Sequence, residues 1–119
     1  MSPLEPSDGV VRDGLYRIAF RTELGAGAGI AVLIDGRVRG GDAHRYFFGQ
    51  YQPSGEGRVR VALQICRHAL PNAARSVFGA DDIRLDLEGQ VAGDEAVLAG
   101  QSPEVPGLRF EAVLSRLAD

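Results

Sequence analysis

The chain has 119 residues, enough for a single domain, and its 45% hydrophobic and 24% charged residues are typical of a globular protein. The formal net charge of −3 disfavours a nucleic-acid-binding surface, and no apolar run approaches the length of about 20 residues that a membrane helix needs. The polar residues 1–12 lack the basic and apolar regions of a signal peptide. We therefore expect a flexible segment over residues 1–12, a single domain over residues 13–119, and a cytoplasmic location.

Three short β-forming runs open the domain, at residues 14–20, 27–34 and 45–51. Asp35 and Gly36 follow the second run, and Asp-Gly is a favoured pair for a type I′ turn because both central residues need positive φ. These features predict a β-meander.

The glycine-rich residues 25–29 match a dinucleotide-binding fingerprint only in part. Ile30 stands where the third glycine of that fingerprint belongs, and a strand follows where the phosphate site needs a helix. We interpret the stretch as a flexible loop that enters a strand, where small residues permit close approach of two backbones.

The later segments alternate between apolar and polar residues with a period of two, which is typical of half-buried strands. Gly93 and Asp94 separate two of these strands by a turn. The residues expected on the inner face are Val59, Val61, Leu63, Ile65, Ile83, Leu85, Leu87, Leu108, Phe110, Ala112 and Leu114.

About eight strands with short connections predict an all-β fold, an antiparallel up-and-down barrel of the calycin or lipocalin type. Closing the sheet removes the exposed edges that would pair with other chains. One short helix is expected over residues 71–78, with Asn72 as its amino-terminal cap and Gly79 after its end.

An eight-stranded barrel is either filled by its own side chains or holds one small ligand. The second alternative predicts a carrier or sensor of a small apolar molecule. The residues expected to line its cavity are Tyr16, Ile18, Phe20, Val61, Leu63, Leu85 and Phe110.

An aromatic cluster lies in the third run. Alternation places Tyr46 and Phe48 on one side of the strand and Phe47 on the other. The cluster either packs in the core or forms an interface with a partner, because exposed aromatic patches often mark interfaces. The candidate interface residues are Tyr46, Phe47, Phe48, Tyr51 and Glu56.

No catalytic, cofactor or metal site is expected. Cys66 has no second cysteine for an internal disulfide, and although His68 lies two residues away, we interpret Cys66 as a structural thiol. Asp42, His44 and residues 81–82 do not have the spacing of a closed metal site. No nucleophile, base and orienting group occur in recognisable order, so we expect no enzyme.

Four motifs together resemble the GrlR-like family of negative regulators of type III secretion gene expression, at residues 13–20, 40–42, 49–51 and 76–79. The resemblance implies a calycin-like barrel, a homodimer, an apolar cavity, and regulation by sequestering a transcriptional activator without binding DNA. One departure concerns residues 53–57, which contain the single carboxylate Glu56 where the founding regulator displays an acidic run that contacts its activator.

Overall fold

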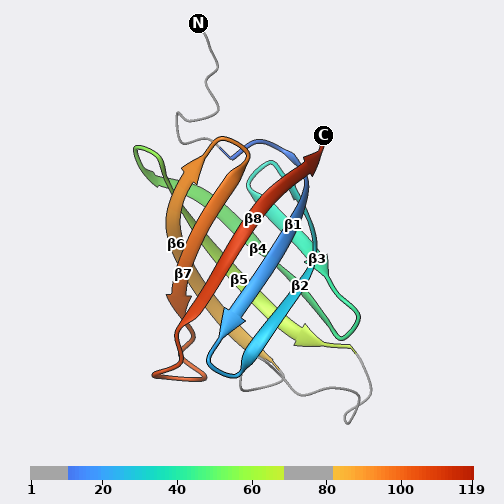
Figure 1. Cartoon of the computed structure of the whole chain (residues 1–119), viewed down its shortest axis with the longest axis vertical. Coiled ribbons are helices and arrows are strands. Elements are labelled where there is room, and N and C mark those ends of the chain that lie inside the picture. The colour runs from blue at the N-terminus through green and yellow to red at the C-terminus, as the bar shows by residue number, and fades with distance from the viewer. Residues whose placement is uncertain (1–10, 69–81) are drawn as a thin grey trace, which may run out of the picture.

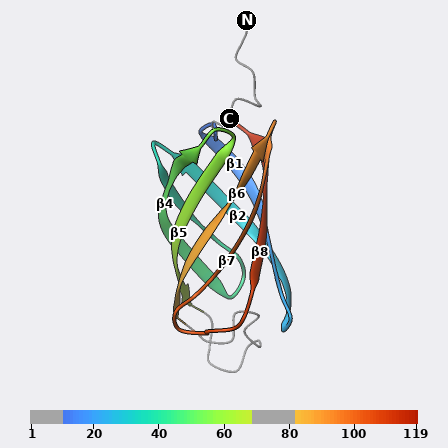
Figure 2. The same ribbon diagram turned by 90° about the vertical axis from the view of Figure 1, so that its left-hand side faces the viewer.

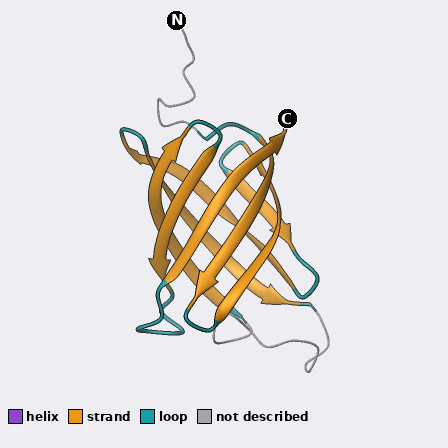
Figure 3. Ribbon diagram, viewed as in Figure 1, coloured by secondary structure: helices purple, strands orange, loops and turns teal. Residues whose placement is uncertain are grey.

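The computed structural model describes residues 11–68 and 82–119, and these form a closed antiparallel β-barrel (Figure 1). Each strand pairs with the next one along the chain, and β8 closes the barrel by pairing with β1. The described residues contain strands and loops without a helix (Figure 3). The strands are β1 Gly14–Thr22, β2 Gly25–Ile34, β3 Arg37–Gly41, β4 Arg45–Gly55, β5 Arg58–Arg67, β6 Ile83–Ala92, β7 Glu95–Gln101 and β8 Phe110–Ala118.

The predicted all-β up-and-down barrel of eight strands is therefore confirmed. Seen from the side in Figure 2, strands β4 to β8 follow one another around the wall. The helix expected over residues 71–78 lies outside the described residues, as do residues 1–10 of the expected amino-terminal segment.

Alternation along each strand decides which side chains fill the barrel. In β5 and β6 the predicted inner positions are all buried, as Val59 and Leu85 illustrate at 2% and 0% exposure. Twenty hydrophobic residues form one core cluster, contributed by all eight strands. Leu108 lies just before β8 and is half-buried against this core.

The turns follow the expected chemistry. Asp35 and Gly36 join β2 to β3 with φ values of 55° and 80°, so both central residues have the positive φ that the Asp-Gly pair predicts. Gly93, with φ of 64°, turns the chain between β6 and β7.

The interpretation of residues 25–29 as a loop is wrong, because β2 begins at Gly25 and these residues pair with β1. The close approach expected there does occur at Gly29, where a Cβ atom would lie 2.4 Å from the carbonyl oxygen of Gly41. Strand pairing supplies the backbone hydrogen bonds that a free loop would leave to water.

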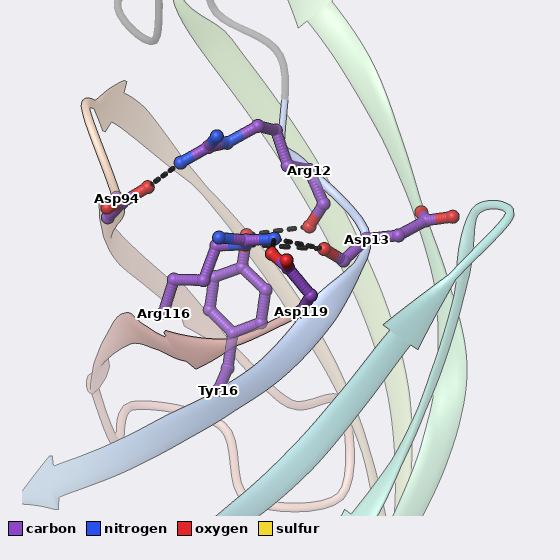
Figure 4. Close-up of polar contacts among 6 residues, drawn as sticks. All are labelled: Arg12, Asp13, Tyr16, Asp94, Arg116 and Asp119. Carbon is purple, nitrogen blue, oxygen red and sulfur yellow. Dashed lines mark hydrogen bonds and ion pairs between the residues drawn. The ribbon is translucent and has the colours of Figure 1, made fainter.

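A polar network ties residues 12–16 to Asp94, Arg116 and Asp119 at one end of the barrel (Figure 4). Arg12 forms an ion pair with Asp94, and the hydroxyl of Tyr16 donates to the carbonyl oxygen of Arg12 at 2.7 Å. Arg116 donates to the carbonyl oxygen of Asp13 at 3.1 Å and pairs with Asp119. Burial raises the pKa of Tyr16.

This network includes Arg12, on the amino-terminal side of residue 13. Arg12 takes part through both its side chain and its carbonyl group, and Val11 packs against the core. Residues 11 and 12 therefore contact the barrel.

Glu104 organises the connection between β7 and β8. Its carboxylate accepts a hydrogen bond at 2.9 Å from the backbone N–H of Arg84 and another at 3.0 Å from the hydroxyl of Ser102, which is buried. The bond from the Arg84 N–H is the main cause that lowers the pKa of Glu104.

This lowered pKa predicts a pH-dependent contribution of Glu104 to stability. A carboxyl group whose pKa is lower in the folded than in the unfolded chain stabilises the fold at pH values above its unfolded pKa, about 4.3. This stabilisation is lost as the pH falls through the folded pKa. We expect the stability difference between wild type and Glu104→Gln to be full at pH 7 and to shrink below about pH 4.3, measured by urea unfolding. Glu23→Gln, in the exposed turn between β1 and β2, is the control; a Glu104→Gln difference that stays constant with pH would contradict the prediction.

Candidate protein-binding face

One wall of the barrel carries large apolar side chains on its outer surface. The strand register sets the outward residues of β2 opposite those of β3, and these in turn opposite those of β4. The strands lie side by side in Figure 1. We call this wall the β2–β4 face, formed by Ile30, Val32, Ile34, Arg37, Arg39, Tyr46, Phe48 and Gln50.

The exposure of this face is high for side chains of this size. Ile30, Val32 and Ile34 are 45%, 41% and 53% exposed, and Tyr46 and Phe48 are 44% and 46% exposed. Single exposed apolar residues are ordinary, whereas a contiguous patch of them marks interaction sites on soluble proteins.

The sequence of β2 explains half of this patch. Its second half, residues 30–34, is apolar at every position: Ala31 and Leu33 are fully buried inside, while Ile30, Val32 and Ile34 face outward. A strand that is apolar on both faces is typical of a sheet covered on both sides. Among the described residues, no element covers the outer side of β2.

The other half of the patch is an aromatic pair on β4. The rings of Tyr46 and Phe48 are stacked, with centroids 6.3 Å apart and an interplanar angle of 15°. His68 approaches Tyr46 from the side of β5, with ring centroids 6.3 Å apart. Hydrogen bonding with Cys66 is the main cause that raises the pKa of Tyr46. Tyr46 is thus in contact with the end of β5, and the pair presents an aromatic surface.

Arginines without carboxylate partners are interleaved with this patch. Within residues 11–68 and 82–119, Arg17, Arg37 and Arg39 form no ion pair; Arg17 is the residue of β1 that lies opposite Ile30. Other arginines of the same region do form ion pairs with Asp or Glu, namely Arg12, Arg21, Arg58, Arg60, Arg84, Arg109 and Arg116. Positive charge that is not neutralised locally therefore collects on the wall that carries the apolar patch.

A groove of about 560 Å³ continues the face across β5 to β6. Arg37 and Arg39 contribute one side, and β6 contributes the other with Asp86 and with Arg84, which is bound to Glu104 at 3.1 Å. Phe48 and Gln50 lie between them. A groove with an aromatic wall and guanidinium groups can hold a segment that offers both apolar and acidic side chains.

The predicted interface residues do not all lie on this face. Tyr46 and Phe48 do, but Phe47 points into the core at 4% exposure, so its assignment to an interface is wrong. Tyr51 is half-buried, and its hydroxyl donates to the carboxylate of Asp13 at 3.3 Å. Glu56 lies in the turn after β4, at the opposite end of that strand from Tyr46. The alternation that exposes Tyr46 and Phe48 is the reason that Phe47 is inside.

The predicted cavity-lining residues all lie inside the barrel, but as parts of the packed core. Their exposed fractions run from 0% at Phe110 to 5% at Phe20, and the rings of Phe20 and Phe47 meet edge to face at 5.8 Å. If the barrel held a cavity large enough for a ligand, the side chains around it would keep surface that a water-sized molecule could contact. These seven side chains have almost none, so they fill the interior instead of enclosing a cavity. The full set is Tyr16, Ile18, Phe20, Val61, Leu63, Leu85 and Phe110.

The residues with catalytic or metal-binding chemistry have structural contacts. His68 Nε2 lies 3.0 Å from the carbonyl oxygen of Asp42, whose carboxylate accepts from the backbone N–H groups of His44 and Arg45. Within the described ranges, no group of three or more His, Cys, Asp and Glu side chains is close enough to hold a metal ion. The described residues also contain no helix that is long and apolar enough to span a membrane.

No sequence motif predicts that Ile30, Val32, Ile34 and the unpaired arginines form a binding face. A usable signal is present in the run of residues 30–34, which breaks the period of two that residues 58–67 and 83–91 keep. The unpaired state of Arg37 and Arg39 had no such signal, because ion pairing depends on which strands become neighbours.

Comparison with known proteins yields no assignment. No protein-family model matches the chain, and no curated protein matches it. The GrlR-like resemblance therefore stays a prediction, while the fold and the β2–β4 face stand on the structure.

Proposed function

We propose that this protein is a non-enzymatic regulator that binds another protein through the β2–β4 face. The observation that carries the proposal is the set of five large apolar side chains, each 41% to 53% exposed, gathered on one wall of a filled barrel. Covering such a patch releases water from apolar surface and supplies the free energy of association. The GrlR-like resemblance adds that the partner is a transcriptional activator of type III secretion genes.

The face favours a partner other than a second copy of the chain. In a twofold-symmetric dimer, residues near the axis contact the same residues of the other copy. A dimer centred on this face would bring Arg37 and Arg39 against their own copies, and like charges in contact disfavour association. The homodimer that the resemblance implies would therefore use another surface.

The proposal predicts that polar changes on the face abolish capture of a partner. The tagged full chain is purified gently from its own cells, and the complex is identified by native mass spectrometry. We expect a second polypeptide with the wild type that is lost from the Ile34→Ser/Phe48→Ser variant, because this variant removes apolar contacts at both ends of the patch.

Val97→Ser is the matched control, because Val97 is 59% exposed on β7, on the opposite side of the barrel from β3. It should retain the polypeptide. Equal capture by the wild type and the Ile34→Ser/Phe48→Ser variant would overturn the assignment of this face.

A further inference from the structure

We propose that the partner presents an acidic, apolar segment to the β2–β4 face, with carboxylates on Arg37 and Arg39 and apolar side chains on Phe48 and on the outward residues of β2. This inference rests on the proposed function, since it names the chemistry of the segment that the same face binds. It is carried by charge complementarity and by the arrangement of the two kinds of side chain.

The strand register places the outward side chains of β2, β3 and β4 in rows that run across the three strands. Arg39 lies between Val32 on β2 and Phe48 on β4, and Arg37 lies between Ile34 and Gln50. Each guanidinium group is thus flanked by an apolar side chain on the surface. A segment lying across these strands meets alternating basic and apolar positions, and only a segment with acidic and apolar residues matches both.

The electrostatic argument comes from the contrast with the rest of the surface. The chain carries a net charge of −3, yet Arg17, Arg37 and Arg39 have no carboxylate partner in the described part of the chain. Arg84 on the far side of the groove is satisfied by Glu104. A partner carboxylate can therefore bind Arg37 or Arg39 without displacing an internal ion pair of the described region, and guanidinium groups match carboxylates in a bidentate geometry.

A protein segment fits this face better than a nucleic acid. Ile30, Val32 and Ile34 have no counterpart in a sugar-phosphate backbone, whereas they match leucine or isoleucine side chains. The segment contacts side chains and not strand edges here, because β3 is hydrogen-bonded to β2 and β4 over its whole length, Arg37–Gly41. Binding by strand addition is therefore excluded at this position.

The test measures binding of labelled probes to the full chain by fluorescence anisotropy. The first probe is a short peptide in which pairs of glutamates alternate with pairs of leucines. The second is the same peptide with lysine in place of glutamate, and the third is a single-stranded DNA oligonucleotide. We expect the glutamate peptide to bind most tightly, with an affinity that falls as salt is added. When this peptide binds, the backbone amides of the protein whose chemical shifts change should lie in β2, β3 and β4.

Charge variants locate the effect. Arg37→Glu/Arg39→Glu should weaken binding of the glutamate peptide by about tenfold or more, and Arg37→Lys/Arg39→Lys should weaken it less, because lysine keeps the charge and loses the bidentate geometry. Arg109→Glu is the control, because it reverses the charge of one arginine away from the face, beside β7, where Arg109 pairs with Glu111. All three arginine positions are exposed, so thermal unfolding of each variant should match the wild type.

Three results would overturn the inference: equal binding of the glutamate and lysine peptides, tighter binding of the DNA, or an unchanged affinity in Arg37→Glu/Arg39→Glu. These results are distinct from failure of the proposed function. If the acidic preference is absent while the captured polypeptide is still lost from Ile34→Ser/Phe48→Ser, the face binds a partner through apolar contacts alone.

Discussion

Phe47→Ala should destabilise the protein by about 3–5 kcal/mol, whereas Phe48→Ala, the same change one residue later, should cost less than about 1 kcal/mol. Phe47 is 4% exposed and packs edge to face on Phe20, so its removal leaves a cavity in the core. Phe48 is 46% exposed on the outer wall, where water replaces the lost ring. Urea unfolding of both variants, analysed with the same dependence of the free energy of unfolding on urea concentration, measures the difference in stability.

The pair also tests the register of β4. A shift by one residue would exchange every inner and outer side chain of the strand, so Phe48 would become the core residue. A larger loss from Phe48→Ala than from Phe47→Ala would show that the barrel and its β2–β4 face are assigned the wrong way round. The net stability of a domain is typically about 5–15 kcal/mol, so Phe47→Ala removes a large share of it.

Gly89→Ala should destabilise the protein by about 1–3 kcal/mol or more, although it adds only a methyl group. Gly89 faces the interior from β6, where a Cβ atom would lie 1.8 Å from the carbonyl oxygen of Val97 and 2.8 Å from the Cα atom of Leu98. Both atoms belong to the backbone of β7, so relief of the clash requires the two strands to separate. Unfolding by urea, with hydrogen exchange of the β6 and β7 amides, reports the global and the local effect.

Gly27→Ala is the matched control for this change. Gly27 also lies within a strand, β2, but a Cβ atom there meets no atom within 4 Å. We expect its effect to be small. Equal costs for the two substitutions would contradict the close approach of β6 and β7 at Gly89.

The filled interior changes the balance between the two functions that the sequence leaves open. The carrier hypothesis needs space among the inner side chains, and residues such as Ile18 and Leu85 are 2% and 0% exposed. The regulator hypothesis needs an exposed surface, and Ile34 and Phe48 provide it. The buried interior therefore favours the regulator hypothesis over the carrier hypothesis.

The sequence alone determined the class of fold and much of the core. The period of two in residues 58–67 and 83–91 placed Val59, Leu63 and Leu85 inside, and the Asp35-Gly36 pair located a turn. These features are local: the alternation of side chains follows from the pleat of a single strand, and the turn follows from positive φ at two adjacent residues.

Only the tertiary structure decided which face of β4 points outward and which arginines stay unpaired. Alternation grouped Tyr46 with Phe48 but did not say on which side of the wall they lie. Pairing of Arg21 with Glu111 depends on closure between β1 and β8, and nothing local predicts that Arg37 and Arg39 meet no carboxylate in the described part of the chain. The physical reason is that a strand's own sequence specifies the alternation of its side chains. Which strands become its neighbours, and therefore which residues pair with its charged side chains, depends on closure of the barrel.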